Sequence, residues 1–226
     1  MNRDDIRTQF NQIAKKYDEG RRCFIPCFDD YYVRSVSLLK KLKPTAAKVV
    51  DLGAGTGLLT KEMYLLYPEA SFTLIDLSDD MLDVARQRFK GLGQFEYLME
   101  DYTSNLPVDA DIFCSALSIH HLDNDTKQHL DRAIYEALPA GGVFINLDQF
   151  CADSPIVNEA WNTWWFQYIE GSGITDEAKA RWLERKQLDK EVSVPTTIKW
   201  LNDAGFNHVE CVYQFMKFGT LIAVKS

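Results

Sequence analysis

Apolar and polar residues follow two different periods from residue 48 onward. Short runs rich in Val, Ile, Leu and Phe alternate with stretches in which apolar residues recur at helical spacing. The short runs predict strands at 48–52, 72–76, 94–99, 110–116 and 143–148. The helical spacing predicts helices between them at 57–67, 78–90 and 124–138. This alternation is typical of an α/β fold with a parallel, doubly wound sheet.

The segments on either side of this alternating part have a different pattern. Helical spacing of apolar residues predicts a helical N-terminal segment over 3–19 and 29–42. Further helices are predicted within 154–190, interrupted at Gly171-Ser172-Gly173, and from Pro195 to about Ala204. The last apolar runs, 206–214 and 217–224, are joined so tightly that they predict an antiparallel hairpin.

Three alternating glycines follow the first predicted strand, which ends in Asp51. Gly53, Gly55 and Gly57 would permit backbone angles that a Cβ forbids, and would let a ligand approach bare N–H groups. A strand, a tight turn and a helix in this order predict a nucleotide-binding loop. The G-x-G-x-G spacing differs from the G-x-G-x-x-G of dinucleotide sites. For this motif alone, a glycine-rich loop without a ligand remains the alternative.

Acidic residues end the second and third predicted strands. Asp76 would lie beside the glycine loop, where a carboxylate can accept both hydroxyls of a ribose. Asp101 would lie one strand further out, where it could accept the exocyclic amine of an adenine. Either acid alone could be a solvated strand end. Together with the glycine loop, they favour a nucleoside-containing ligand at the carboxyl edge of the sheet.

The charge and residue composition of the chain limit the kinds of partner that it is expected to bind. The chain of 226 residues has a net charge of −8, and 26% of its residues are charged, as in ordinary globular proteins. The negative charge opposes docking on nucleic acid or anionic membranes, although a local basic patch would permit it. Five scattered cysteines and a polar N-terminus without a signal peptide predict a cytoplasmic protein. We expect no membrane span, and a monomer or homodimer.

With these residues, the chain resembles the class I S-adenosylmethionine-dependent methyltransferases over nearly its whole length. Asp51–Gly57 matches the first motif of the family, and Asp101-Tyr102 matches its adenine-binding pair. Ser115–Leu122 resembles the fourth motif, whose backbone lies near the sulfonium, and Leu138–Gly142 matches the turn into the fifth strand. The C-terminal hairpin matches the antiparallel sixth and seventh strands, which nicotinamide dehydrogenases lack.

The resemblance implies S-adenosyl-L-methionine as cofactor, S-adenosyl-L-homocysteine as product, and a seven-stranded sheet in the order 3-2-1-4-5-7-6. The cofactor-binding residues that it implies are Tyr17, Asp51, Gly53, Ala54, Gly55, Thr56, Gly57, Asp76, Leu77, Met81, Glu100, Asp101, Tyr102, Ser115, Ala116 and His121. It also implies one domain over 1–226, with a helical cover (1–43), a Rossmann-like core (44–150 and 191–226) and a helical lid insertion (151–190).

Methyl transfer from a sulfonium needs mainly in-line placement of the acceptor, and orientation of this kind can supply roughly 7–11 kcal/mol of the barrier. A base is needed only if the acceptor is protonated. His120 and His121 follow the fourth predicted strand and are the main catalytic candidates, with Tyr17 and Arg21 beside them. Alternatively, one histidine packs or caps the next helix, or both bind a divalent metal with Asp148. We predict no dedicated metal site.

The acceptor pocket is expected where the flanking segments cover the core. Arg21 could pair with a carboxylate of the cofactor or the substrate, whereas Arg22 could equally form a surface ion pair. Trp161, Trp165 and Tyr168 share one helix face, which is typical of core packing but would also suit a lid over a flat or cationic acceptor. The predicted pocket residues are Arg21, Tyr31, Tyr32, Asp148, Trp161, Trp165 and Tyr168.

The leading hypothesis is therefore in-line methyl transfer to a small-molecule acceptor. The helical N-terminal segment before this core is also similar to the group of carboxy-S-adenosylmethionine synthases and wobble-uridine tRNA methyltransferases. Such a synthase should carry arginines for the extra carboxylate, and only Arg21 or Arg22 is a candidate. The third hypothesis is a module that binds S-adenosylmethionine without catalysis.

Overall fold

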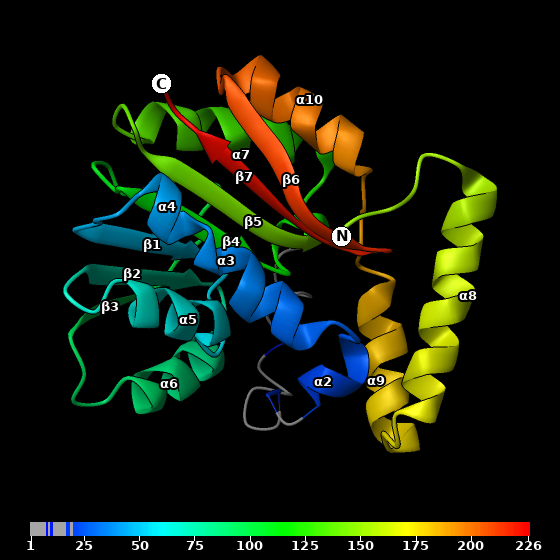
Figure 1. Cartoon of the computed structure of the whole chain (residues 1–226). Coiled ribbons are helices and arrows are strands. Elements are labelled where there is room, and N and C mark those ends of the chain that lie inside the picture. Colours follow the sequence, from blue (N-terminus) through cyan, green and yellow to red (C-terminus); the bar gives the residue numbers. More distant parts are fainter. Residues whose placement is uncertain (1–7, 9, 11–16, 19) are drawn as a thin grey trace.

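A computed structural model describes residues 8, 10, 17, 18 and 20–226. Seven strands form one sheet in the order β3-β2-β1-β4-β5-β7-β6 (Figure 1). β1 to β5 are parallel, and β7 runs antiparallel between β5 and β6. The predicted fold class and strand order are confirmed. The strands are β1 (Lys48–Leu52), β2 (Ser71–Asp76), β3 (Gln94–Met99), β4 (Ile112–Ala116), β5 (Val143–Gln149), β6 (His208–Phe215) and β7 (Phe218–Val224).

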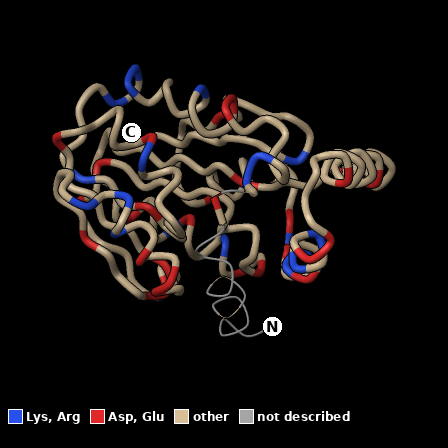
Figure 2. The backbone as a smooth tube through the Cα atoms, turned by 90° about the horizontal axis from the view of Figure 1, so that it is seen from below, with Lys and Arg blue, Asp and Glu red and all other residues tan. Residues whose placement is uncertain are grey.

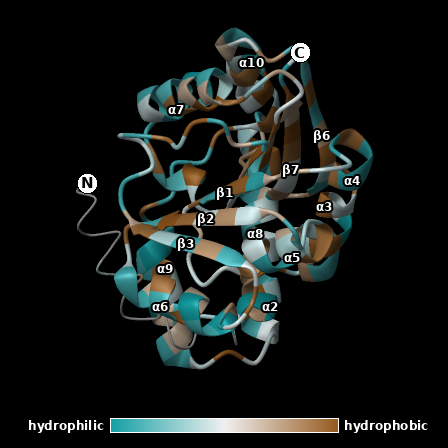
Figure 3. Cartoon of the chain, turned by 90° about the vertical axis from the view of Figure 1, so that its left-hand side faces the viewer, coloured by the Kyte–Doolittle hydropathy of each residue, from teal (hydrophilic) through white to brown (hydrophobic). Residues whose placement is uncertain are grey.

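Successive residues of the central strands point to opposite faces of the sheet, and each face has its own apolar core. Val49 of β1 joins the core under α5 and α6, whereas Val50 joins the core under α7 and α10. Apolar strands therefore lie between two layers of helices, as the colouring in Figure 3 shows. The helices of these layers are α5 (Leu58–Leu66), α6 (Asp79–Arg88), α7 (Asn124–Ala137) and α10 (Val194–Ala204).

Local signals explain where the core helices begin. The Ser78 side chain accepts a hydrogen bond from the backbone N–H of Met81 at 3.1 Å, and Asp79 and Asp80 lie in the first turn of α6. The hairpin between β6 and β7 turns at Met216, whose φ of 50° is left-handed. This turn is as tight as predicted. Within the described part of the chain, we find no helix with the length and apolar character of a membrane span.

The segment before β1 is helical but irregular. It consists of α2 (Arg21–Phe24), a π-helical turn η2 (Asp30–Arg34), α3 (Ser35–Ser37) and α4 (Leu39–Leu42). The helix predicted over 29–42 thus begins as a π-helix, which is common at functional sites. The helix predicted over 3–19 lies mostly outside the described residues.

The insertion after β5 forms two helices, α8 (Pro155–Gly171) and α9 (Asp176–Lys186), at one end of the sheet (Figure 1). Trp165 of α8 contacts Trp182 of α9 edge to face, with ring centroids 5.1 Å apart. The indole N–H of Trp165 donates a hydrogen bond of 2.7 Å to the carbonyl oxygen of Phe24. Acidic and basic residues are interspersed on α9 (Figure 2). The insertion is therefore attached to the N-terminal segment as well as to the sheet.

Candidate active site

A cavity of about 900 Å³ lies at the carboxyl ends of β1, β2 and β4. The strand order reverses between β1 and β4, and ligands of open α/β sheets bind at such a switch point. Among the predicted cofactor-binding residues, the cavity wall contains Tyr17, Asp51, Gly53, Ala54, Gly55, Thr56, Asp76, Leu77, Met81, Asp101, Tyr102, Ala116 and His121. We refer to this space as the cofactor cavity.

The three glycines of the loop differ in what surrounds them. All have left-handed φ angles, +70° at Gly53, +54° at Gly55 and +78° at Gly57. A Cβ at Gly53 would lie 2.0 Å from Oγ of Ser118, and one at Gly57 would lie 2.6 Å from Cε2 of Phe89. A Cβ at Gly55 would meet open space. Gly53 and Gly57 are thus required for packing, whereas Gly55 leaves bare backbone in the cavity wall.

Asp76 organises the loop from the end of β2. Its Oδ2 accepts a hydrogen bond from the N–H of Gly55, and its Oδ1 accepts one from the N–H of Ser78, both at 2.8 Å. Burial raises the pKa of Asp76 to about 6, although these backbone donors lower it. Burial also raises the pKa of Asp51 to about 7, despite a hydrogen bond from Thr60 at 2.5 Å. Two acidic groups of this cavity therefore have pKa values close to neutrality.

Three predicted cofactor residues lie outside the cavity wall. Glu100 is exposed, and Gly57 begins α5. Ser115 is buried and donates a hydrogen bond of 2.7 Å to the carbonyl oxygen of Leu52. Ser115 therefore joins β4 to β1 behind the cavity. The wall also contains residues outside the predicted cofactor-binding set: Phe10, Tyr32, Leu58, Leu59, Ser78, Leu117, Ser118 and Leu122.

The N-terminal segment covers the glycine loop through Asp18. Its Oδ1 accepts a hydrogen bond of 2.6 Å from the hydroxyl of Thr56, and its other oxygen pairs with the guanidinium of Arg88. Tyr17 therefore lies over the cavity. Leu117, between β4 and η3 (Ile119–His121), has a φ of 54° although it is not glycine. Such strain is concentrated at functional sites.

A second cavity of about 480 Å³ adjoins the first. Phe10, Tyr17, Leu117 and His121 lie in the walls of both. The other residues of the second cavity are Arg21, Phe24, Ile25, His120, Gln149, Trp165, Trp182, Arg185, Lys186, Asp189 and Phe218. We refer to it as the acceptor cavity. It lies where the N-terminal segment, η3 and the insertion meet.

Two arginines give the acceptor cavity an unusual amount of cationic surface. The guanidinium of Arg21 lies 4.4 Å from the ring centroid of Tyr17, and its buried Nε makes no hydrogen bond within the described residues. Burial lowers the pKa of Arg185, although Tyr17 partly compensates. Arg22 lies outside and pairs with Asp29 at 2.6 Å on the surface, so the surface interpretation of Arg22 is confirmed.

His120 and His121 lie on η3 between the two cavities. Nδ1 of His120 contacts Oδ1 of Asp148 at 2.5 Å, and Asp189 lies near both imidazoles. Burial disfavours a charged imidazole, but Asp148 and Asp189 outweigh it and raise the pKa of His120 to about 10. Burial and the neighbouring His120 lower the pKa of His121. The pKa of His120 therefore lies well above neutrality, whereas that of His121 lies below its ordinary value.

The structure places the predicted acceptor residues in different regions. Trp165 lines the acceptor cavity, and Tyr32 lines the cofactor cavity. Tyr31 is fully buried against Phe218, and the hydroxyl of Tyr168 donates to the carbonyl oxygen of Arg22. Tyr31, Trp161, Tyr168 and Asp148 line neither of the two cavities, and their role in acceptor binding stays a prediction. They were placed by helix face or strand end alone, and packing turns them elsewhere.

Arg185 and Asp189 are the residues of this site that the sequence analysis misses. Both belong to a charged stretch of α9 and the turn after it, which has the pattern of a solvated helix. The metal alternative considered Asp148 with the two histidines, but Asp189 is the carboxylate that faces both rings. Nothing in the local pattern distinguishes Asp189 from its exposed neighbours.

Comparison with known proteins agrees with this geometry. A family model described as a methyltransferase domain matches residues 49–142. The carboxy-S-adenosyl-L-methionine synthase of Nautilia profundicola is 21% identical over 97% of this chain and 96% of that protein. The synthase of the same name from Helicobacter hepaticus is 25% identical over 99% of this chain and 98% of its own length.

Solved structures share the fold at low sequence identity. A putative O-methyltransferase from Nostoc punctiforme superposes with a TM-score of 0.68 at 18% identity, covering 96% of this chain and 60% of that one. Human N-acetylserotonin methyltransferase in complex with its cofactor gives a TM-score of 0.60 at 20% identity, covering 97% and 56%. The chain thus spans less than two thirds of these structures.

A methyltransferase domain is thus matched over residues 49–142, and the surrounding fold is the one found in solved methyltransferases. S-adenosyl-L-methionine stays the predicted cofactor, and it is the ligand in the solved structure of human N-acetylserotonin methyltransferase. The cavity fits this group, because Gly55 leaves bare backbone and Asp76 presents a carboxylate in the same wall. The binding role of each residue stays a prediction.

Proposed function

We propose that this methyltransferase acts on a small acceptor that carries an anionic group. The observation that carries the proposal is the position of Arg21 and Arg185 in a cavity that adjoins the cofactor cavity. Buried guanidinium groups bind carboxylate or phosphate by charge-assisted hydrogen bonds. The anionic group would lie at the arginines and the nucleophile at the shared wall near His121.

Trp165 and Trp182, with Phe24, form the apolar part of the acceptor cavity. These rings exclude water and favour an acceptor with a flat or apolar body. When bound, S-adenosylmethionine supplies an activated methyl group. The task of the chain is then to hold the nucleophile in line with that methyl, which is the orientation effect expected from the sequence.

His121 is the residue best suited to accept a proton from the acceptor. Its pKa is lowered by burial and by His120, which favours the neutral imidazole, and it lies in the walls of both cavities. His120 is held as a cation between two carboxylates and would position His121 rather than act as a base. The catalytic roles suggested for Tyr17 and Arg21 become binding roles in this proposal.

The test measures formation of S-adenosylhomocysteine with a panel of small acids and phosphates, each paired with its neutral amide or ester. We expect turnover with an anionic compound and loss of at least about tenfold with its neutral partner, as for removal of a charge-assisted hydrogen bond. Arg21→Met and Arg185→Met should raise KM for the acceptor and leave cofactor affinity unchanged. Arg22→Met is the matched control and should change neither. Equal use of neutral compounds would contradict the proposal.

Synthesis of a carboxylated S-adenosylmethionine is a second candidate. It is favoured by the name of the relatives that align over nearly the whole chain, and by the unpaired Nε of Arg21 near the cofactor cavity. Mass spectrometry separates the two candidates after incubation with a small-molecule extract. A methyltransferase yields S-adenosylhomocysteine, whereas a synthase yields an ion heavier than the cofactor by one carboxyl group in place of hydrogen.

A further inference from the structure

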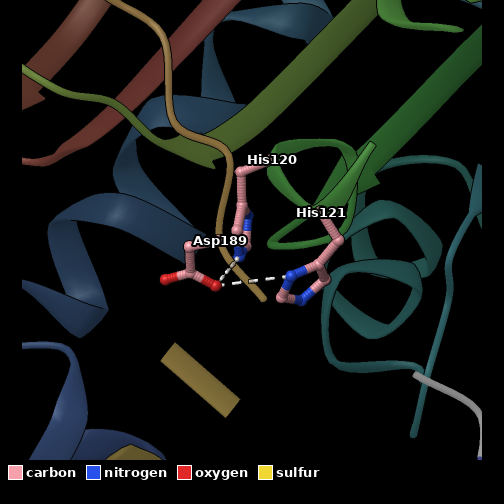
Figure 4. A group of neighbouring side chains, drawn as sticks. All are labelled: His120, His121 and Asp189. Carbon is pink, nitrogen blue, oxygen red and sulfur yellow. Dashed lines mark ion pairs between the residues drawn. The ribbon is translucent and has the colours of Figure 1, made fainter. Parts of the chain in front are cut away.

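Three side chains converge between the cofactor cavity and the acceptor cavity. Figure 4 shows His120 and His121 from η3 and Asp189 from the segment after α9, with one carboxylate oxygen facing both rings. Oδ1 of Asp189 lies 3.4 Å from Nε2 of His120 and 3.3 Å from Nδ1 of His121. The side chains are 3%, 9% and 8% exposed for His120, His121 and Asp189.

These separations are ion-pair distances and are longer than the distance of about 2.7–3.2 Å at which most N–H groups and oxygens form hydrogen bonds. Nδ1 of His121 is buried and makes no hydrogen bond within the described part of the chain. Ligands held at about 2.0–2.1 Å by a tetrahedral zinc ion lie about 3.3–3.4 Å from one another. The two distances from Oδ1 of Asp189 match this edge length, and all three ligand atoms lie within 4.8 Å of one another.

The surroundings of the cluster have the form of a second ligand sphere. Nδ1 of His120 is hydrogen-bonded to Asp148, which directs Nε2 of the same ring toward the cluster. Metal-bound histidines commonly use their other nitrogen in this way, because the carboxylate fixes the ring orientation. Oε1 of Gln149 is a further buried oxygen without a hydrogen bond in the same cavity.

A neighbouring lysine pairs with one carboxylate oxygen of Asp189, and the other oxygen faces the histidines. Nζ of Lys186 lies 3.4 Å from Oδ2 of Asp189, so it occupies the oxygen that faces away from the histidines. Arg21 and Arg185 lie in the wall of the same cavity. Asp189 faces both rings, and Asp148 adds a second carboxylate on the far side of the His120 ring. Their charge would balance that of a divalent cation.

We propose that His120, His121 and Asp189 bind a divalent transition-metal cation, with Zn²⁺ as the first candidate. Two imidazoles and one carboxylate leave a coordination position for an exogenous ligand, as in catalytic zinc sites. All three residues lie in the wall of the acceptor cavity. An acceptor oxygen bound there would lose its proton more readily. Metal binding would displace the proton from Nε2 of His120, and His121 would then be a ligand rather than a base.

The experiment uses the whole chain, freed of metal with a chelator and titrated with Zn²⁺ by calorimetry. Neither S-adenosylmethionine nor an acceptor is present, so the result is independent of the proposed acceptor. We expect one Zn²⁺ per chain. Asp189→Asn, which keeps the side-chain shape, should weaken binding at least about tenfold, and Asp148→Asn should weaken it about 10–100-fold.

His129→Ala is the matched control, because this histidine is exposed on α7 and its Nδ1 contacts its own helix. It should bind Zn²⁺ as the wild type does. Co²⁺ should give the visible absorption bands of a tetrahedral site in the wild type and lose them in His121→Ala and Asp189→Asn. Circular dichroism checks that these variants fold. Equal Zn²⁺ affinity of wild type and Asp189→Asn would overturn the proposal, as would a wild type without Zn²⁺ binding.

Discussion

The two adjoining cavities are built in different ways. The cofactor cavity is lined mostly by residues that directly follow β1, β2 and β4 and by Asp101-Tyr102 after β3. The acceptor cavity is lined by residues from the N-terminal segment, η3, β5, the insertion and β7. The first is thus determined by the ends of neighbouring strands, whereas the second depends on how distant segments pack together. Substitutions that disturb packing between segments should therefore affect the acceptor cavity. Substitutions in the glycine loop should affect the cofactor cavity.

The largest expected effect is the loss of folding stability in Trp165→Ala. This side chain is 3% exposed, packs against Trp182 and donates a hydrogen bond to Phe24. Truncation of such an aromatic residue costs about 3–5 kcal/mol. Chemical denaturation should show a loss of this size in the free energy of unfolding. Trp161→Ala on the same helix is the control. A similar loss of stability there would show that the loss in Trp165→Ala does not come from the position of Trp165 in the acceptor cavity.

Asp76→Ala should weaken S-adenosylmethionine binding by an order of magnitude or more. The substitution removes the carboxylate that holds Gly55 and Ser78 and that faces the cofactor cavity. Loss of hydrogen bonds to a charged group costs about 1.5–3 kcal/mol each. Calorimetry gives the affinity, and Asp80→Ala, an exposed residue of α6, is the control. Unchanged affinity would mean that Asp76 only ends its strand.

Gly55→Ala should destabilise the chain by about 1–2 kcal/mol, because an L-residue pays that much for a left-handed backbone. The φ of Gly55 is +54°, and its Cβ would project into open space. Gly53→Ala has the same backbone cost plus a clash with Ser118, so its melting temperature should be lower. The opposite order of melting temperatures would contradict the assignment of Gly55 to the cavity wall.

The smallest effect concerns pH. The pKa of Asp76 is raised to about 6, and its ionised form is the one that would accept hydrogen bonds from the ribose hydroxyls. Affinity for S-adenosylmethionine should therefore fall as the pH falls through this value, by about fourfold between pH 7 and pH 5.5. Asp76→Asn, which cannot ionise, is the reference for all other titrating groups. A drop of equal size in that variant would exclude Asp76 as its source.

The same difference between the cavities explains what sequence reasoning could predict. Strand order, the glycine loop and Asp76 follow from local periodicity and from features that occur at the end of one strand. Arg185 and Asp189 lie on an ordinary charged helix and the turn after it, and acquire significance only because α9 packs against η3 and the N-terminal segment. Trp161 and Tyr168 were placed by helical spacing, which gives a shared face but not the partner that this face meets.

The hydrogen bond from Trp165 to Phe24 has a consequence for engineering. It joins the insertion after β5 to the N-terminal segment, although the two bonded residues are 141 positions apart in the chain. An insertion transplanted alone from another methyltransferase would leave a backbone carbonyl of the recipient without its donor. Acceptor preference should therefore be exchangeable as a pair of segments, 17–34 together with 151–190, while the strands and the glycine loop stay unchanged.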